Sequence, residues 1–181
     1  MKEILLGGLG GQGVLTAGVL LAEMAMYQGY QATWSPEYGS AMRGGTANCT
    51  VKYNKGRIYN PTKEAPDLLL AMNDVAFKTY APLLKEGGIM VVNSDMVEVD
   101  DVRPDIHVVK VPCMSLAEEI GHPLGANIIM CGVIMKLLGE FEENAAAEGM
   151  NAMFRAKGKE KFEAKNTEAF HLGYHYEPKD E

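Results

Sequence analysis

The 181-residue sequence predicts an α/β fold, an open, mostly parallel, Rossmann-like sheet with helices on both faces. Short, continuously apolar runs of the kind found in buried parallel strands alternate with longer apolar segments of helical length. The first run, "EILL", enters the glycine-rich turn "GGLGGQG" and emerges directly as an apolar helix. Apolar residues make up 47% of the chain, which is enough to fill a sizeable core.

The first three elements are expected to form one βαβ unit. Residues 2–6 make a short apolar strand, and residues 14–28 have the length and composition of a buried helix. Gly29 suits the end of that helix because glycine accepts the left-handed conformation that follows many helices. Residues 31–34 form the next strand, so we expect a parallel pair joined by a right-handed crossover.

The rest of the sheet is expected further along the chain. Residues 46–53 alternate in polarity, and "GRIYNP" after the turn at 54–56 is predicted to pair back on them as a β-hairpin at the edge. The remaining predicted elements are strands at 67–72, 88–93 and 107–111 and helices at 74–85, 115–120 and 127–138.

The residues that begin these later helices are of the types that commonly cap a helix N-terminus. Asn73 or Asp74 is expected to cap the helix at 74–85. Ser115 and Glu118 have the spacing of a capping box. Asn127 is expected to be the N-cap of the strongly apolar helix that follows it.

Composition divides the chain into three parts. Residues 1–140 are predicted to form the α/β sheet domain with the glycine-rich loop. Residues 141–175 are more charged and are predicted to form a helical C-terminal arm packed on that domain, with a break at Gly149 or Gly158. Residues 176–181 are expected to be a frayed tail.

Charge and cysteine content argue against several functions. A formal net charge of −7 and the lack of a basic run disfavour a nucleic-acid partner. Three separated cysteines offer no CxxC pair and too few ligands for an iron–sulfur cluster or a structural zinc, and they indicate reduced thiols in a cytoplasmic protein. The uncharged stretch 4–22 is too rich in glycine for a spanning helix, so no membrane association is expected.

The segment "GLGGQG" at residues 8–13 matches the pattern G-x-G-x-x-G between a strand and a helix. The N–H groups that begin a helix, together with the positive end of its dipole, attract a phosphate or a carboxylate. Glycines let such an anion approach the backbone closely. We therefore single out Gly8, Gly10, Gly11, Gln12 and Gly13 as ligand, anion or interface positions.

Two other interpretations of this loop stay open. A dinucleotide would require an acidic residue at the end of the second strand, where the chain has Ser35 and Pro36 before Glu37. Alternatively, the glycines only allow the helix to pack closely on the strand.

A second loop, "EYGSAMRGG", is expected beside the first one at the carboxyl edge of the sheet. Arg43 in this loop would make a two-point contact with a carboxylate or a phosphate, or would be a solvated surface residue. The ligand, anion or interface positions predicted in this loop are Tyr38, Gly39, Ser40, Arg43, Gly44 and Gly45.

Taken together, "GGLGGQGV", "TAGVLLAEMA" and "EYGSAMRGG" resemble the gamma subunits of the 2-oxoacid:ferredoxin oxidoreductases, the pyruvate, ketoisovalerate and 2-oxoglutarate enzymes. The likeness continues in "DLLLAM", "GGIMVVNS", "LGANIIMCGVIMKLLG" and "NTEAFHLGY", and so covers essentially the whole chain. Family members often have an acidic residue where this chain has Ser40.

The resemblance implies a subunit that is inert by itself in an enzyme converting a 2-oxoacid and coenzyme A to acyl-CoA, CO2 and reduced ferredoxin. Thiamine diphosphate, Mg and iron–sulfur clusters would be bound by alpha, beta and possible delta partner subunits, with ferredoxin reached through the complex. This chain would contribute to assembly and to part of the coenzyme A or active-site wall. No catalytic residue is assigned to it, and an isolated chain would be a candidate homodimer.

Two other functions remain open from the residues themselves. One is a free-standing NAD(P)-binding oxidoreductase, and the other is a non-enzymatic regulatory module that binds a small anion. Cys113 is expected to be a structural thiol, and His107 and His122 are expected to be structural too. His171 and His175 have the spacing of one helix face, but Gly173 lies between them and two histidines are too few for a metal site, so none is assigned.

Overall fold

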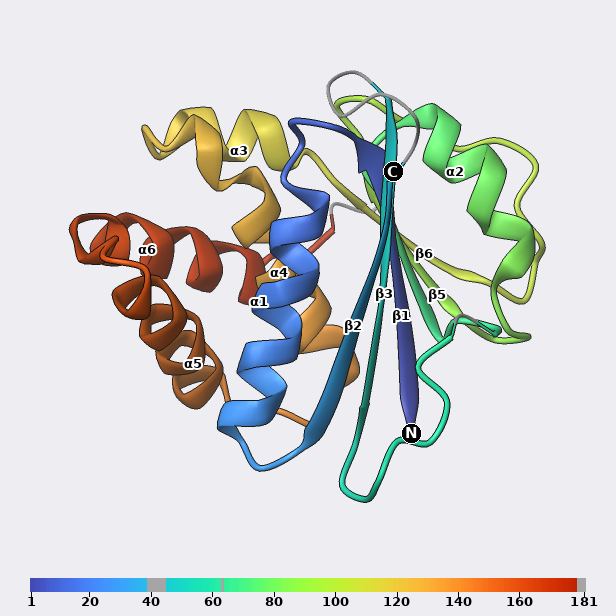
Figure 1. Ribbon diagram of the computed structural model, residues 1–181. Coiled ribbons are helices and arrows are strands. Elements are labelled where there is room, and N and C mark those ends of the chain that lie inside the picture. The colour runs from blue at the N-terminus through green and yellow to red at the C-terminus, as the bar shows by residue number, and fades with distance from the viewer. Residues whose placement is uncertain (39–44, 63, 179–181) are drawn as a thin grey trace.

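The computed structural model describes residues 1–38, 45–62 and 64–178, and these form a six-stranded sheet with helices on both faces (Figure 1). The strands are β1 (Lys2–Leu9), β2 (Gln31–Tyr38), β3 (Thr46–Asn54), β4 (Leu68–Ala71), β5 (Ile89–Asn93) and β6 (His107–Val111). The helices are α1 (Val14–Tyr27), α2 (Asp74–Tyr80), α3 (Cys113–Glu119), α4 (Ala126–Leu138), α5 (Glu143–Ala156) and α6 (Glu163–Tyr174).

The strand order is β2-β3-β1-β4-β5-β6, and the pairs from β1 to β6 are parallel. The predicted α/β class with a mostly parallel sheet is therefore confirmed. The predicted adjacency of the first and second strands is wrong, because β3 lies between β1 and β2 and runs antiparallel to both.

The predicted partner of the edge hairpin is also wrong. Both sides of β3 are occupied, by β1 and by β2, so that "GRIYNP" finds no open strand edge there. The first six residues after β3, 55–60, contain no strand. The hairpin at this edge is formed instead by β2 and β3, with Gln31 opposite Asn54 and Tyr38 opposite Ala47.

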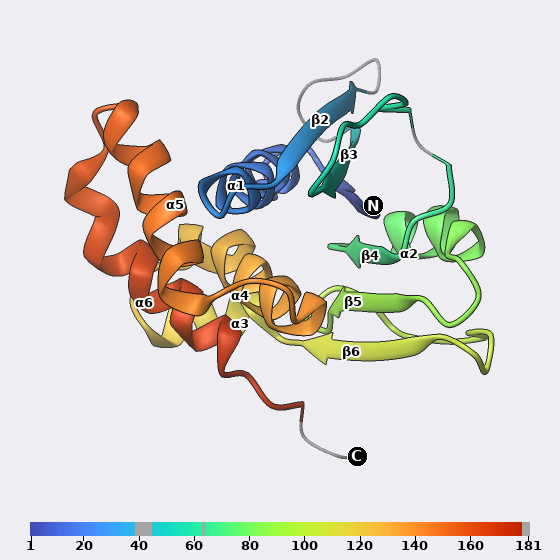
Figure 2. The same ribbon diagram turned by 90° about the horizontal axis from the view of Figure 1, so that it is seen from below.

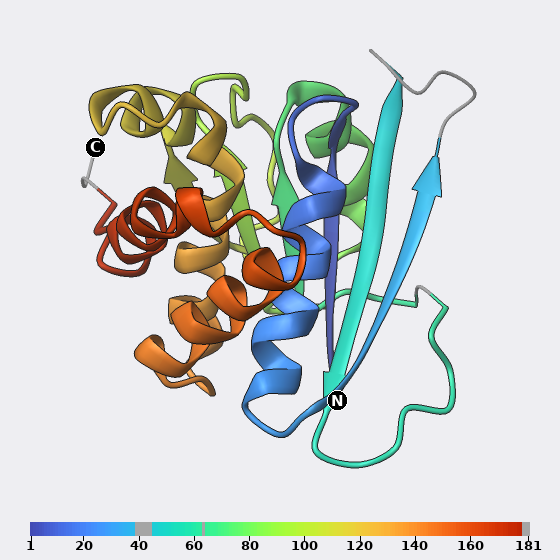
Figure 3. The same ribbon diagram turned by 60° about the vertical axis from the view of Figure 1, so that its left-hand side comes forward.

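Alternating strand residues face two cores of unequal size. On one face, Leu6, Leu70 and Val91 belong to the larger core, which α1, α3 and α4 cover, with α5 and α6 further out (Figure 3). On the other face, Leu5 and Leu69 belong to a smaller cluster under α2. The helix predicted over 74–85 ends at Tyr80 and continues as a 3-10 turn over Ala81–Leu83, where Pro82 cannot donate the next helical hydrogen bond.

The C-terminal helices form the outer part of the thicker layer. Helix α5 packs on α1, and α6 packs on α4 (Figure 2). The break predicted in this region falls at Gly158, which has a φ of 66°, whereas Gly149 lies inside α5. Residues 176–178 carry no regular structure, and residues 179–181 of the predicted tail lie outside the described residues. Among the helices that the structure describes, none has the length and hydropathy needed to cross a bilayer.

Candidate anion-binding site

The glycine loop connects the carboxyl end of β1 to the first turn of α1. Gly11 has a φ of 103° and Gly13 a φ of 73°, both in the region that favours glycine. A Cβ on Gly8 would lie 2.5 Å from Val14 Cγ2. The loop is thus a tight left-handed turn in close contact with its own helix, and the packing interpretation explains Gly8.

Gln12 holds this turn from the inside. Its Oε1 accepts hydrogen bonds from the Leu9 N–H at 2.7 Å and from Asn73 Nδ2 at 3.0 Å. Its Nε2 donates to the carbonyl oxygen of Met72 at 3.2 Å. The Gln12 side chain therefore ties the end of β1 to the end of β4 and holds the loop in place. Its predicted ligand contact stays a prediction.

Buried asparagines complete the same network. Asn73 caps α2, as predicted, because its Oδ1 accepts from the Ala76 N–H at 2.9 Å. Asn93 Nδ2 donates to the Met72 carbonyl at 3.2 Å. Asn93 is not among the residues predicted from the sequence, although an Asn directly after an apolar strand, as in "VVN" and "AMN", was the available signal.

The prediction for Asn127 is wrong. Gly125 occupies the N-cap position of α4, and Asn127 lies in the first turn of the helix. From there its Nδ2 donates to the Gly13 carbonyl at 3.1 Å. A Cβ on Gly13 would lie 2.6 Å from this same Nδ2. The side chain that would have capped α4 instead fixes the end of the glycine loop.

The outer side of the loop is open. Gly11 is exposed, and among the residues that the structure describes no atom lies within 4 Å of the position that its Cβ would occupy. The first intrahelical hydrogen bond of α1 runs from the Ala17 N–H to the Gly13 carbonyl at 2.9 Å. The N–H groups of the residues before Ala17 therefore have no partner within the helix, and they lie at the positive end of its dipole.

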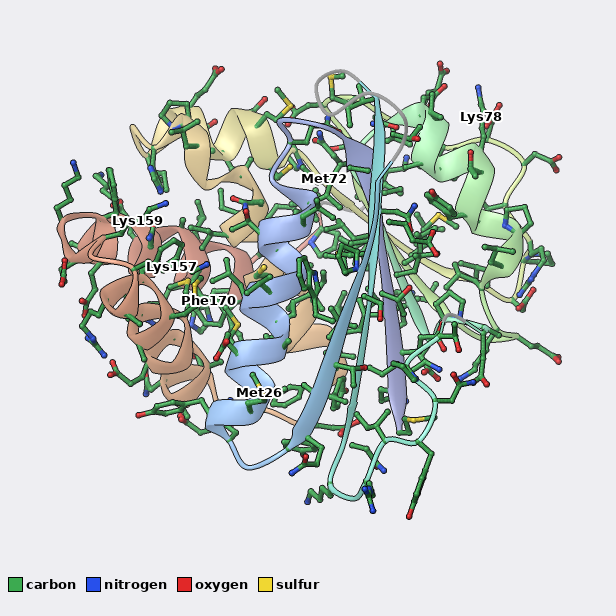
Figure 4. The ribbon with its side chains drawn as sticks, in the orientation of Figure 1. Met26, Met72, Lys78, Lys157, Lys159 and Phe170 are labelled. Atoms are coloured by element: carbon green, nitrogen blue, oxygen red, sulfur yellow. The ribbon has the colours of Figure 1, made fainter. Side chains whose placement is uncertain are left out.

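A cavity of about 450 Å³ adjoins this opening. Its wall is built by the glycine loop, by the connection between α3 and α4, and by the connection between α5 and α6. Lys159 contributes a positive charge, and Met114, Leu124 and Phe162 contribute exposed apolar surface. Figure 4 labels Met72 near the start of α1 and Lys159 near the α5–α6 connection. The space therefore combines an anion-attracting end with an apolar wall.

The second predicted loop reaches the first one in its described part. The Gly10 N–H donates to the carbonyl oxygen of Gly45 at 3.0 Å. Tyr38 ends β2, one strand further from β1 than expected. Gly39, Ser40, Arg43 and Gly44 lie outside the described residues, so their ligand roles stay predictions.

The expected structural role of Cys113 is consistent with its surroundings. Burial raises the pKa of its thiol to about 12, and the nearby carboxylate of Asp95 acts in the same direction. That carboxylate accepts from the N–H groups of Met114 and Ser115 at 2.8 and 3.1 Å. Asp95 therefore caps α3 from another part of the chain, and the predicted capping box of Ser115 is wrong because the helix begins two residues earlier, at Cys113.

All three cysteines are described, and all are buried and free. Burial raises the pKa of Cys49 to about 12 and also raises that of Cys131. Three protonated, buried thiols do not match the four ligands that an iron–sulfur cluster requires.

His122, which was expected to be structural, makes a hydrogen bond through its Nε2 with Asn166 Oδ1 at 2.9 Å.

A mostly parallel sheet with an open glycine loop at its carboxyl edge defines an α/β domain suited to an anionic ligand. Residues 3–176 match the family described as pyruvate ferredoxin/flavodoxin oxidoreductase, and the chain belongs to this family.

Similar proteins agree with this assignment. The chain is 34% identical over 176 residues to the 2-oxoglutarate synthase subunit KorC of Methanocaldococcus jannaschii. This match covers 96% of this chain and 92% of the relative. It is 32% identical over 158 residues to the ketoisovalerate oxidoreductase subunit VorA of Methanothermobacter marburgensis, covering 87% of this chain. The chain spans 33% of the length of that ketoisovalerate relative.

Its fold is also similar to the crystal structure of the gamma subunit of a keto/oxoacid ferredoxin oxidoreductase from Geobacter sulfurreducens. The TM-score is 0.80 at 32% identity, with 96% of each chain covered. The resemblance to the gamma subunits of this family, inferred from the sequence motifs, is confirmed.

Proposed function

We propose that this chain is the gamma-type subunit of a 2-oxoacid:ferredoxin oxidoreductase and forms part of the site for coenzyme A. Its relatives are named as subunits of 2-oxoglutarate and ketoisovalerate oxidoreductases. The observation that carries the coenzyme A part is the open face of Gly11 at the start of α1, beside a cavity that also receives Lys159. A phosphate group of coenzyme A is the kind of anion that such a helix start attracts.

The apolar rim of the cavity supports the second half of the proposal, which is assembly. Leu124 is 85% exposed, and Phe162 and Met114 are about half as exposed. Apolar side chains gathered around an anion site suit contact with another subunit over a shared ligand. In this proposal thiamine diphosphate, Mg and the iron–sulfur clusters are held by alpha, beta and delta partners, and ferredoxin is reached through the complex.

The topology disfavours the dinucleotide interpretation. In a dinucleotide-binding sheet the strand carrying the ribose-binding acid lies next to the strand of the glycine loop. Here β3 separates β2 from β1, so Glu37 on β2 is a full strand away from the expected place. A regulatory anion-binding module would share the glycine loop but would not copurify in fixed ratio with thiamine-binding chains.

The test uses the complex purified from cells with this chain in place. We expect the chain to copurify stoichiometrically with thiamine-binding subunits. The variant Gly11→Asp places a carboxylate at the helix start, and we expect it to raise the KM for coenzyme A about tenfold while the KM for the oxoacid stays unchanged. Gly29→Asp is the matched control, because Gly29 also has a positive φ and open space around its Cβ position.

The outcomes separate the two halves of the proposal. Failure to copurify would overturn the subunit role. Normal assembly with an unchanged KM for coenzyme A in Gly11→Asp would overturn the coenzyme A role alone. Loss of assembly in Gly11→Asp, with Gly29→Asp intact, would show that the loop is a subunit interface.

A further inference from the structure

Three side chains from the two C-terminal helices converge away from the glycine loop. Glu143 lies in the first turn of α5, whereas His171 and His175 lie at the end of α6. The two helices pack side by side (Figure 2). His171 Nδ1 donates to Glu143 Oε1 at 2.5 Å, and His175 Nε2 donates to the same oxygen at 2.8 Å. One carboxylate oxygen thus accepts hydrogen bonds from two imidazole rings.

The fold explains why this cluster forms. Residues four apart lie on one helix face, and the rings of His171 and His175 stack with centroids 6.5 Å apart. Gly173 does not interrupt the helix, contrary to the concern raised by the sequence, because α6 runs unbroken to Tyr174. The third side chain, Glu143, comes from 28 residues earlier, which is why the histidine pair looked insufficient in the sequence.

The donor set suits a transition-metal dication. One ligand atom from each of the three residues lies within 4.8 Å of the others. Tetrahedral Zn²⁺ with nitrogen and oxygen ligands places them about 3.4 Å apart, so small side-chain rotations would suffice. Two imidazoles and one carboxylate favour Zn²⁺, Co²⁺, Ni²⁺ or Cu²⁺ over Mg²⁺ or Ca²⁺.

Opposite helix ends meet at this cluster. The end of α6 carries the negative end of its helix dipole, which favours a cation, and the start of α5 carries the positive end, which the negative charge of the Glu143 carboxylate offsets. Glu143 Oε1 lies within hydrogen-bond distance of both imidazole rings, so one carboxylate oxygen already stands between the two ring nitrogens. The His175 side chain is 65% exposed, so the cluster is open to solvent and an ion can reach it. The neighbouring Glu142 carboxylate is engaged with the N–H groups of Asn144 and Ala145.

We propose that Glu143, His171 and His175 form a binding site for a divalent transition metal of the Zn²⁺ type, which clamps the start of α5 to the end of α6. The two imidazole nitrogens and the carboxylate oxygen would bind the ion directly, in place of the hydrogen bonds that they make with one another. Because the ion binds only when both helices are docked, it would stabilise the folded C-terminal arm by mass action.

The test uses the full chain without an affinity tag. Co²⁺ absorption and Zn²⁺ calorimetry would measure the affinity and the stoichiometry of metal binding. The absence of a thiolate-to-cobalt charge-transfer band would show that the cysteines of unfolded chains do not bind the ion. We expect one metal ion per chain. His175→Ala and Glu143→Gln should each weaken binding at least about tenfold, whereas His107→Ala, which removes an exposed histidine elsewhere, should bind as the wild type does.

Thermal unfolding gives a second, independent result. At about a hundredfold excess of Zn²⁺ over its Kd, Tm should rise by about 5–10 °C in the wild type and in His107→Ala. In His175→Ala the rise should be absent. This variant changes an exposed side chain, so it keeps the fold. Equal binding and an equal rise in Tm in the wild type and His175→Ala would overturn the proposal, as would a folded wild-type chain that binds no metal ion.

Discussion

Glycines are essential in two regions of this molecule, but for opposite physical reasons. In the loop between β1 and α1, Gly11 and Gly13 are required by backbone conformation, since both have a positive φ. Where α4 crosses α6, Gly132 and Gly173 have ordinary helical backbone and are required by contact. A Cβ on Gly173 would lie 1.9 Å from the Ile129 carbonyl oxygen, and one on Gly132 would lie 2.1 Å from the Phe170 carbonyl oxygen.

The difference bears on how each region works. Among the described residues nothing fills the space beside Gly11, which suits a ligand. The helix crossing instead fills the space beside its glycines with the backbone of the neighbouring helix. A similar contact joins α5 to α1, where a Cβ on Gly149 would lie 2.8 Å from Tyr27 Cβ. The loop is therefore suited to binding, and the crossings hold the helical layer on the sheet. Substitutions can test this distinction.

The largest effect is expected at the helix crossing. Gly173→Ala forces a methyl group against the α4 backbone, which cannot move without separating the helices, and should lower the free energy of unfolding by about 3 kcal/mol or more. Urea unfolding followed by circular dichroism measures the change. Gly158→Ala is the control, because Gly158 has a positive φ of 66° and open space, so its cost should be about 1 kcal/mol. Equal costs for the two variants would contradict a contact role for Gly173.

A smaller loss is expected when the support of the loop is removed. Gln12→Leu leaves the Leu9 N–H and the Asn73 amide without the acceptor that they share, and should cost about 2 kcal/mol in the same urea measurement. Gln12→Glu keeps that acceptor but cannot donate to the Met72 carbonyl, so it should fall between the wild type and Gln12→Leu. If all three proteins unfold at one urea concentration, the network does not stabilise the loop.

The smallest effect is expected on the open side of the loop. Gly11→Ala adds a methyl group that meets no atom of the described residues within 4 Å, so the expected cost is backbone strain of about 1 kcal/mol. Its urea midpoint should lie slightly below that of Gly158→Ala, because a φ of 103° is further from the left-handed minimum than a φ of 66°. A cost as large as that of Gly173→Ala would show that the space beside Gly11 is not available to a ligand.

The sequence by itself determined the class of the fold and most of its elements, apart from the strand expected in "GRIYNP" and the length of α2. Apolar strands, the glycine turn and the apolar helices are local patterns, and they predicted the strand–loop–helix start, the parallel strands β4, β5 and β6, and the family resemblance. The glycine loop was found for the same reason, because its requirement for a positive φ is a property of the loop itself.

Only the tertiary structure decided which segments meet. The antiparallel β3 enters between β1 and β2 because strand pairing depends on which edges are free, and that is not encoded locally. Asn127 supports Gly13 from 114 residues away, and Glu143 meets His171 from 28 residues away. Gly132 and Gly173 are ordinary helix positions until the two helices cross. Such contacts depend on how segments far apart in sequence meet in space, so local periodicity and residue spacing could not predict them.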